Sequence, residues 1–161
     1  MQPCLHVSWR EDARQPQGVG FARLNGYGAY VAVCAQAAAG PDDRVRVVRI
    51  VAAVDCGELV NPDAVRNQIE GGIVQATSWT LHEKARFDRT SITSTDWNLY
   101  PIMRITEAPN VEVHLIDRPG ESYLGVGEAA QRPAGAAVAN AAARLQGPRR
   151  RTLPPNESKQ E

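Results

Sequence analysis

The most regular pattern in the sequence is an apolar stripe that begins just after Asn61-Pro62-Asp63. Asn can cap the free amides at the start of a helix, Pro fits the first helical position, and Asp favours the positive end of the helix dipole. The stripe continues at helical spacing to about Lys84, and the pattern predicts a helix over residues 62–84 that buries one face. Its members are Val65, Ile69, Ile73, Ala76 and Thr80.

Two glycines interrupt this predicted helix at its centre. Gly71 and Gly72 each cost about 1 kcal/mol relative to Ala inside a helix. Two explanations follow: another part of the molecule approaches the helix backbone closely there, or the helix is loose or kinked.

Three other segments have the residue types and alternation of β-strands. They are residues 27–38, residues 44–54 and residues 111–116. Turn residues at 40–43 join the first two into an antiparallel hairpin. An Ala-rich stretch predicts a second helix at about 133–145. The expected fold is therefore α+β, with an antiparallel sheet of a hairpin plus at least one further strand, covered by two main helices.

The length of 161 residues suits one hydrophobic core. We expect an irregular N-terminal segment at 1–17, one domain segment at 18–154 and a disordered tail at 155–161. Residues 87–100 are rich in Ser and Thr and are expected to form a loop. The three arginines at 149–151 are interpreted as a solvated edge of the molecule.

Charge and hydropathy exclude several classes of partner. The 18 Lys and Arg residues balance 18 Asp and Glu residues, whereas proteins that depend on nucleic acid or anionic membranes carry a basic excess. No apolar run approaches the roughly 18 residues that span a bilayer, so no membrane span is expected. The first residues lack a basic stretch followed by an apolar core, and no secretory signal is expected.

Cysteine and histidine usage predicts no metal site made by this chain alone. The cysteines are odd in number and contain no C-x2-C pair, and the histidines lack any ligand spacing. A reducing, cytoplasmic setting fits this usage best. The residues concerned are Cys4, Cys34, Cys56, His6, His82 and His114.

The segment Gly125-Val-Gly-Glu-Ala-Ala130 matches the dinucleotide-binding pattern G-x-G-x-x-A. The context argues against that function, because the preceding strand ends too early and no acidic residue follows about twenty positions later. Glycine lets a backbone press against a flat ligand, and Glu128 beside it could act as a general base. The structural alternative is that Glu128 caps the helix that follows.

Four motifs occur in order along the chain: Asp55-Cys-Gly57, Val60-Asn-Pro-Asp63, Asn67-Gln-Ile-Glu-Gly-Gly72 and Gly125-Val-Gly-Glu128. Their order and spacing resemble the C-terminal part of the molybdopterin-binding large subunit of the molybdenum hydroxylases, the xanthine dehydrogenase and aldehyde oxidoreductase family. Three more segments resemble the two-subunit isoquinoline, nicotinate and aldehyde dehydrogenase type. These are Gln75-Ala-Thr-Ser-Trp-Thr80, Asp96-Trp-Asn-Leu-Tyr-Pro101 and Glu128-Ala-Ala-Gln131.

This resemblance implies an oxidoreductase that hydroxylates an electron-poor carbon of an N-heterocycle or an aldehyde and takes the oxygen from water. It implies a molybdenum–molybdopterin cofactor whose metal has no protein side chain as ligand, and the nearer subgroup favours the cytosine dinucleotide form. Electrons would leave through iron–sulfur clusters on a separate small subunit. The implied partners are that subunit, the remainder of the large subunit and the small-molecule substrate.

The resemblance also assigns roles to single residues. Glu128 corresponds to the family's general base, and Gln68 to a glutamine that contacts the pterin. The backbone beside the base would line the cofactor. Without the resemblance, Gln68 is an exposed helix residue and the segment before Glu128 is a tight turn. That segment consists of Leu124, Gly125, Val126 and Gly127.

The sequence also departs from the family pattern. Ala129 stands where many relatives have Pro, and Arg132 stands where a small residue is usual, so Arg132 could crowd the pocket or pair with Glu128. Most of the family's cofactor pocket comes from segments upstream of those present here. The chain is therefore expected to be part of an enzyme and inactive alone, or else a non-catalytic remnant or partner-binding α+β module.

Overall fold

The computed structural model describes residues 15–23 and 28–156, and the expectations for residues 1–14 and 157–161 lie outside the described residues. The elements run in the order β1 (Gln17–Arg23), β2 (Tyr30–Ala39), η1 (Pro41–Asp43), β3 (Val45–Asp55), α1 (Pro62–Leu81), η2 (Ile105–Glu107), β4 (Asn110–Ile116) and α2 (Gln131–Gln146).

The strands form one four-stranded sheet in the order β1-β2-β3-β4. The first two pairings are antiparallel, but β4 runs parallel to β3. The α+β class with two main helices is confirmed, and the sheet differs from the expected antiparallel one in this last pairing. The reason is the connection: α1 lies between β3 and β4 in the chain, and a helical crossover returns the chain to start the next strand in the same direction.

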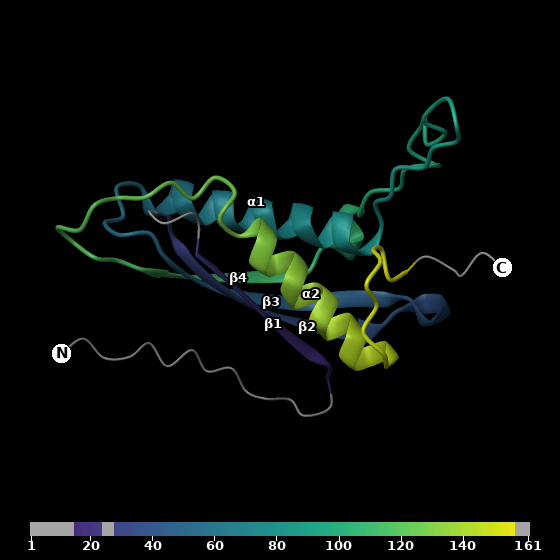
Figure 1. Cartoon of the computed structure of the whole chain (residues 1–161). Helices are drawn as coiled ribbons and strands as arrows, with labels where there is room; N and C mark the ends of the chain where they lie inside the picture. Colours follow the sequence, from purple (N-terminus) through teal and green to yellow (C-terminus); the bar gives the residue numbers. More distant parts are fainter. Residues whose placement is uncertain (1–14, 24–27, 157–161) are drawn as a thin grey trace.

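The core lies between this sheet and the two helices, which pack on one of its faces (Figure 1). Alternate residues of β2 and β3 point toward the helices and are buried, as the strand pattern predicts. In α1 the predicted stripe is buried from Ile69 to Thr80, while its first member, Val65, is half-buried. Asn61 caps this helix, since its side-chain oxygen accepts a hydrogen bond from the Ala64 amide at 3.0 Å.

The strand β1 is absent from the sequence-based prediction, which placed residues 18–23 in the domain but assigned them no strand. Gly18 and Gly20 occupy its core-facing positions, so the strand shows no apolar alternation. The structure gives the reason for both glycines. A Cβ at Gly18 would overlap the Ala137 carbonyl oxygen of α2, and a Cβ at Gly20 would overlap that of Pro133. The Ala-rich helix therefore lies directly on the strand backbone.

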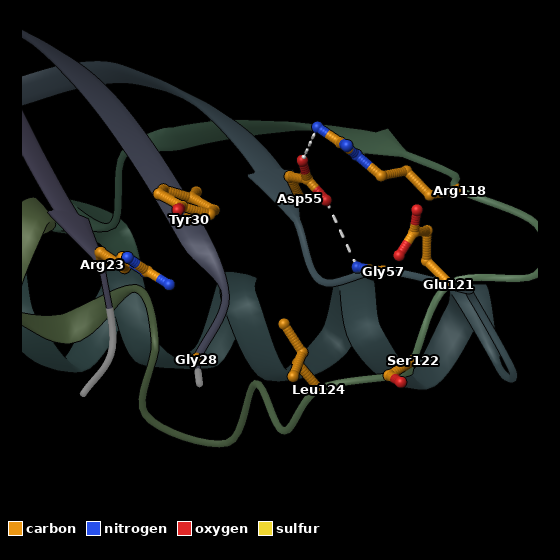
Figure 2. Close-up of a pocket in the computed structure, with 9 residues that line it drawn as sticks. All are labelled: Arg23, Gly28, Tyr30, Asp55, Gly57, Arg118, Glu121, Ser122 and Leu124. Atoms are coloured by element: carbon orange, nitrogen blue, oxygen red, sulfur yellow. Dashed lines mark hydrogen bonds and ion pairs between the residues drawn. The ribbon is translucent and has the colours of Figure 1, made fainter. Parts of the chain in front are cut away.

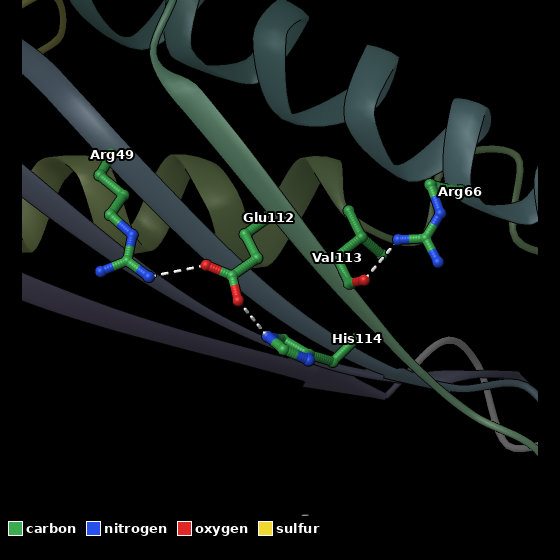
Figure 3. Close-up of polar contacts among 5 residues, drawn as sticks. All are labelled: Arg49, Arg66, Glu112, Val113 and His114. Carbon is green, nitrogen blue, oxygen red and sulfur yellow. Dashed lines mark hydrogen bonds and ion pairs between the residues drawn. The ribbon is translucent and has the colours of Figure 1, made fainter. Parts of the chain in front are cut away.

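The opposite face of the sheet carries no described helix and bears a small polar cluster at the β4 edge (Figure 3). Glu112 bridges Arg49 at 2.6 Å and the His114 ring at 2.8 Å. The hydrogen bond from Arg49 holds the pKa of Glu112 below its usual range. Exposed ion pairs of this kind contribute little to stability, so the cluster mainly sets the polarity of this edge.

Residues 82–109 connect α1 to β4 and project away from the sheet as a long loop, as expected for its 87–100 portion (Figure 1). Hydrogen bonds within the loop hold its conformation. Asp88 and Asp96 each accept backbone amide bonds from residues two and three positions ahead, and Phe87 forms a β-bridge with Ile92. No helix among the described residues is long and apolar enough to cross a membrane.

Candidate functional site

The start of α2, which follows the predicted base by three residues, packs against the middle of α1. The side chain of Gln131 donates a hydrogen bond to Gln75 at 2.8 Å. A Cβ at Gly72 would lie 3.5 Å from the Gln131 side chain and 3.7 Å from that of Ala130. These are ordinary van der Waals distances, and a Cβ at Gly71 would meet no described atom within 4 Å, so packing among the described residues requires glycine at neither position.

Gln68 lies one helical turn before Gly72, on the face of α1 that meets the start of α2. Its side chain is exposed. Glu128 lies three residues before Gln131 and its carbonyl accepts the Gln131 amide at 3.3 Å. No hydrogen bond among the described residues joins Gln68 to Glu128, which lies sixty positions later in the sequence.

In the segment from Leu124 to Gly127, residues that contact the rest of the chain alternate with exposed glycines. The Leu124 amide donates to the Cys56 carbonyl at 2.9 Å, and Val126 is nearly buried. Gly125 and Gly127 are exposed, their φ angles lie outside the left-handed region, and an added Cβ would meet no described atom within 4 Å. Neither local geometry nor described packing requires glycine at these two positions.

The Glu128 carboxylate is exposed and makes no hydrogen bond or ion pair with a described residue. The structure does not support the helix-capping alternative, because the N-cap of α2 is Ala130 and no side chain caps it. Arg132 is also exposed, and no ion pair forms between it and Glu128. The Ala129 amide donates to the Val126 carbonyl at 3.1 Å, a bond that a Pro there could not make.

A hollow of about 550 Å³ opens beside Leu124, where the ends of β2 and β3 meet the loop after β4 (Figure 2). On one side, Asp55 pairs with Arg118 at 2.6 Å and accepts the Gly57 amide at 3.3 Å. On the other, the Arg23 guanidinium lies 5.0 Å from the centre of the Tyr30 ring. Gln68 and Glu128 do not line this hollow.

Sequence reasoning did not identify Asp55 or Arg118 as a pair. Asp55 ends a strand and Arg118 follows another, and only the parallel pairing of β3 with β4 brings these ends together. Gly57 adopts a φ of +78° with its backbone against the Ser122 carbonyl, which explains the glycine of the Asp55-Cys-Gly57 motif. Among the described residues, no group of three His, Cys, Asp or Glu side chains could hold a metal ion.

Comparison with known proteins identifies the class of this domain. The family profile of the molybdopterin cofactor-binding domain matches residues 6–109. A subunit of the nicotinate dehydrogenase of Pseudomonas putida is 41% identical over 110 residues, which is 68% of this chain and 9% of that protein. The beta subunit of isoquinoline 1-oxidoreductase from Brevundimonas diminuta is 33% identical over 113 residues, 70% of this chain and 14% of that protein.

A solved structure gives the same result for the fold. Quinoline 2-oxidoreductase from Pseudomonas putida 86 superposes with a TM-score of 0.66 at 30% identity, over 73% of this chain and 16% of the other. The chain thus spans only a small part of the proteins it matches. From its profile match, its relatives and its fold, the chain belongs to the molybdenum hydroxylase family, as part of the molybdopterin-binding large subunit.

Proposed function

We propose that this chain supplies the general base and one wall of the cofactor pocket in a molybdenum hydroxylase that oxidises an N-heterocycle or an aldehyde. The observation that carries the proposal is the exposed Glu128 carboxylate, which has no described partner and follows the bare backbone at Gly125 and Gly127. A carboxylate without a structural bond is free to accept a proton from a bound reactant.

The residues present fit a large flat ligand. The backbone from Leu124 to Gly127 offers peptide groups without side chains at two positions, so a ligand can approach within hydrogen-bonding distance. The Gln68 amide lies exposed on the adjoining face of α1 and can both donate and accept hydrogen bonds. These residues would hold one edge of the molybdopterin.

When bound, the molybdenum cofactor supplies the two-electron oxidation that accompanies hydroxylation with oxygen from water. The task of this chain is then proton transfer and orientation. Glu128 would accept a proton at its carboxylate oxygens, while the Gln75–Gln131 bond joins the start of α2, three residues later, to α1. Removing the base typically slows such a reaction by about 10²–10⁴-fold.

The proposed partners are the remainder of the large subunit and a small iron–sulfur subunit. Large apolar side chains are exposed on the uncovered sheet face and on the loop 82–109, which supports burial against further polypeptide. Cys34 and Cys56 are free thiols, which suits the proposed cytoplasmic setting. A cytosine dinucleotide form of the cofactor is part of the same proposal. The exposed apolar residues include Val19, Phe21, Phe87, Trp97 and Ile105.

The test is Glu128→Gln in the complete enzyme, with the remainder of the large subunit and its partner subunit supplied. We expect molybdenum content to stay unchanged and turnover to fall about 10²–10⁴-fold, because an amide cannot accept the proton. The matched control is Glu58→Gln, which keeps an oxygen acceptor for the Gly120 amide and should leave turnover unchanged. Full turnover in the Glu128 variant would remove Glu128 from the role of general base.

A further inference from the structure

A second hollow, of about 400 Å³, opens at the C-terminal end of α1, away from the junction that carries Gln68 and Glu128. Four parts of the chain form it: residues 40–47 at the start of β3, the end of α1, the loop before β4, and Asn156. We call it the cationic groove. Its principal lining residues are Arg44, Arg46, Leu81, His82, Met103 and Arg104.

The walls of the cationic groove are fixed by hydrogen bonds between these distant segments. Asn156 accepts the Val45 amide at 2.7 Å and donates to the Val45 carbonyl at 3.0 Å, as a neighbouring strand would. The Met103 amide donates to the Ser78 hydroxyl at 3.0 Å. The groove is therefore a formed feature of the fold, which suits a binding site.

Positive charge is concentrated around the groove, although the whole chain is neutral. The guanidinium groups of Arg44, Arg46 and Arg104 make no ion pair with any described residue, and Arg46 donates one hydrogen bond to the Thr106 carbonyl at 3.3 Å. Glu107 also lines the groove and accepts the Arg104 backbone amide at 2.9 Å, so the lining holds three arginines and one acidic residue. Arginines without an ion-pair partner around a hollow favour a bound anion, because a guanidinium matches the oxygens of a carboxylate or phosphate.

The floor of the groove is apolar. Val45, Val47 and Leu81 are 3%, 2% and 2% exposed, and Met103 lies half-buried beside them. Burial lowers the pKa of His82 below its usual 6.5, so this ring is neutral at pH 7 and adds no charge. An occupant therefore meets apolar side chains below and guanidinium groups at the rim.

We propose that the cationic groove binds a small organic anion, with a carboxylate or phosphate head held by the arginines and an apolar body on the floor. The volume lies within the range of small-molecule sites and suits a body of about one substituted aromatic ring. This site goes beyond the proposed catalytic function, because none of its residues belongs to the Glu128 segment. An acidic segment of a partner protein is a different class of occupant, which the experiment separates.

The chain carries a built-in probe for this test. Among the described residues Met103 is the methionine that lines the groove, and the sequence has one other methionine, Met1. In a chain labelled with ¹³C at the methionine methyl groups, titration with benzoate or phenyl phosphate should shift the Met103 signal to saturation. The anion that binds more tightly identifies the head group. Neutral benzamide and inorganic phosphate should each bind at least tenfold more weakly.

Two variants complete the test. Arg44→Met and Arg104→Met should each weaken binding at least tenfold, while Arg89→Met, an exposed arginine outside the groove, should not change it. The proposal is overturned if neither anion shifts Met103, if benzamide binds as tightly as benzoate, or if both groove variants bind normally. If the groove binds only an acidic segment of a protein, neither anion will shift the Met103 signal. If a variant fails to fold, the comparison of benzoate with benzamide on the natural chain decides.

Discussion

Two G-x-G pairs in this chain serve different purposes. At Gly18 and Gly20 the backbone of α2 lies so close to β1 that any side chain would overlap it. At Gly125 and Gly127 no described atom would meet an added Cβ, and the φ angles are ones that other residues adopt. The first pair is explained by packing within the chain, whereas the second has no such explanation and lies beside the proposed base.

The contacts that an added Cβ would make distinguish glycines required by packing within the chain from glycines that packing does not require. A glycine required by packing has its reason inside the structure, in named neighbouring atoms. A glycine without such neighbours allows an approach by something outside the described residues, and we propose that at Gly125 and Gly127 this is the cofactor. Measurements of stability can test this distinction directly, since only the first pair should be intolerant of a methyl group.

The strongest destabilisation is expected for Gly20→Ala. The added Cβ overlaps the Pro133 carbonyl, so α2 must move away from β1, and the free energy of unfolding should fall by about 3 kcal/mol. Urea unfolding followed by circular dichroism measures the change. A loss below about 1 kcal/mol would mean that the helix is less tightly seated on the strand than the structure indicates.

A weaker destabilisation is expected for Asn140→Ala. The Asn140 side chain on α2 donates to the Val19 carbonyl at 2.9 Å, between the two glycines of β1, and its loss should cost about 1 kcal/mol. Thermal and urea unfolding of this variant should be compared with those of Asn98→Ala, an exposed change in the loop 82–109 that we expect to be neutral. Equal stabilities of the two variants would remove this bond from the contact.

Almost no loss of stability is expected for Gly127→Ala. The position accepts a Cβ without overlap, so the free energy of unfolding should stay within about 0.5 kcal/mol or rise by up to about 1 kcal/mol. In the complete enzyme the same change should lower the molybdenum content, because the methyl group would stand where the cofactor approaches. Destabilisation comparable to that of Gly20→Ala would show that the two pairs do not differ.

Much of the fold follows from sequence patterns. The helix cap at Asn61 and the stripe through Ile69 and Ile73 predicted α1, which ends at Leu81 where the pattern suggested Lys84. Three strands and α2 also lie within a few residues of their predicted positions. The strand β1 was missed because glycine at its buried positions gives no apolar alternation. The parallel pairing of β4 with β3 was missed because the sequence of one strand does not show the direction of its neighbour.

Some residues of the candidate site could be named from the sequence, and others could not. The resemblance named Gln68 and Glu128, and the capping alternative for Glu128 was left open until the structure showed Ala130 at the N-cap. Asp55 and Arg118 were not predicted as a pair, because their meeting depends on strand register. The roles of Gln68, Leu124 to Gly127 and Glu128 toward the cofactor remain predictions for experiments on the complete enzyme.

Capping residues, helical spacing and strand alternation act over a few neighbouring positions, and for that reason the local elements could be inferred from the sequence alone. The motifs likewise indicated the family to which the chain belongs. Two features emerged only from the packed molecule: α2 lies on the bare backbone of β1, and the parallel pairing of β3 with β4 brings Asp55 next to Arg118. Such contacts join residues far apart in the chain, and their geometry depends on how whole elements pack.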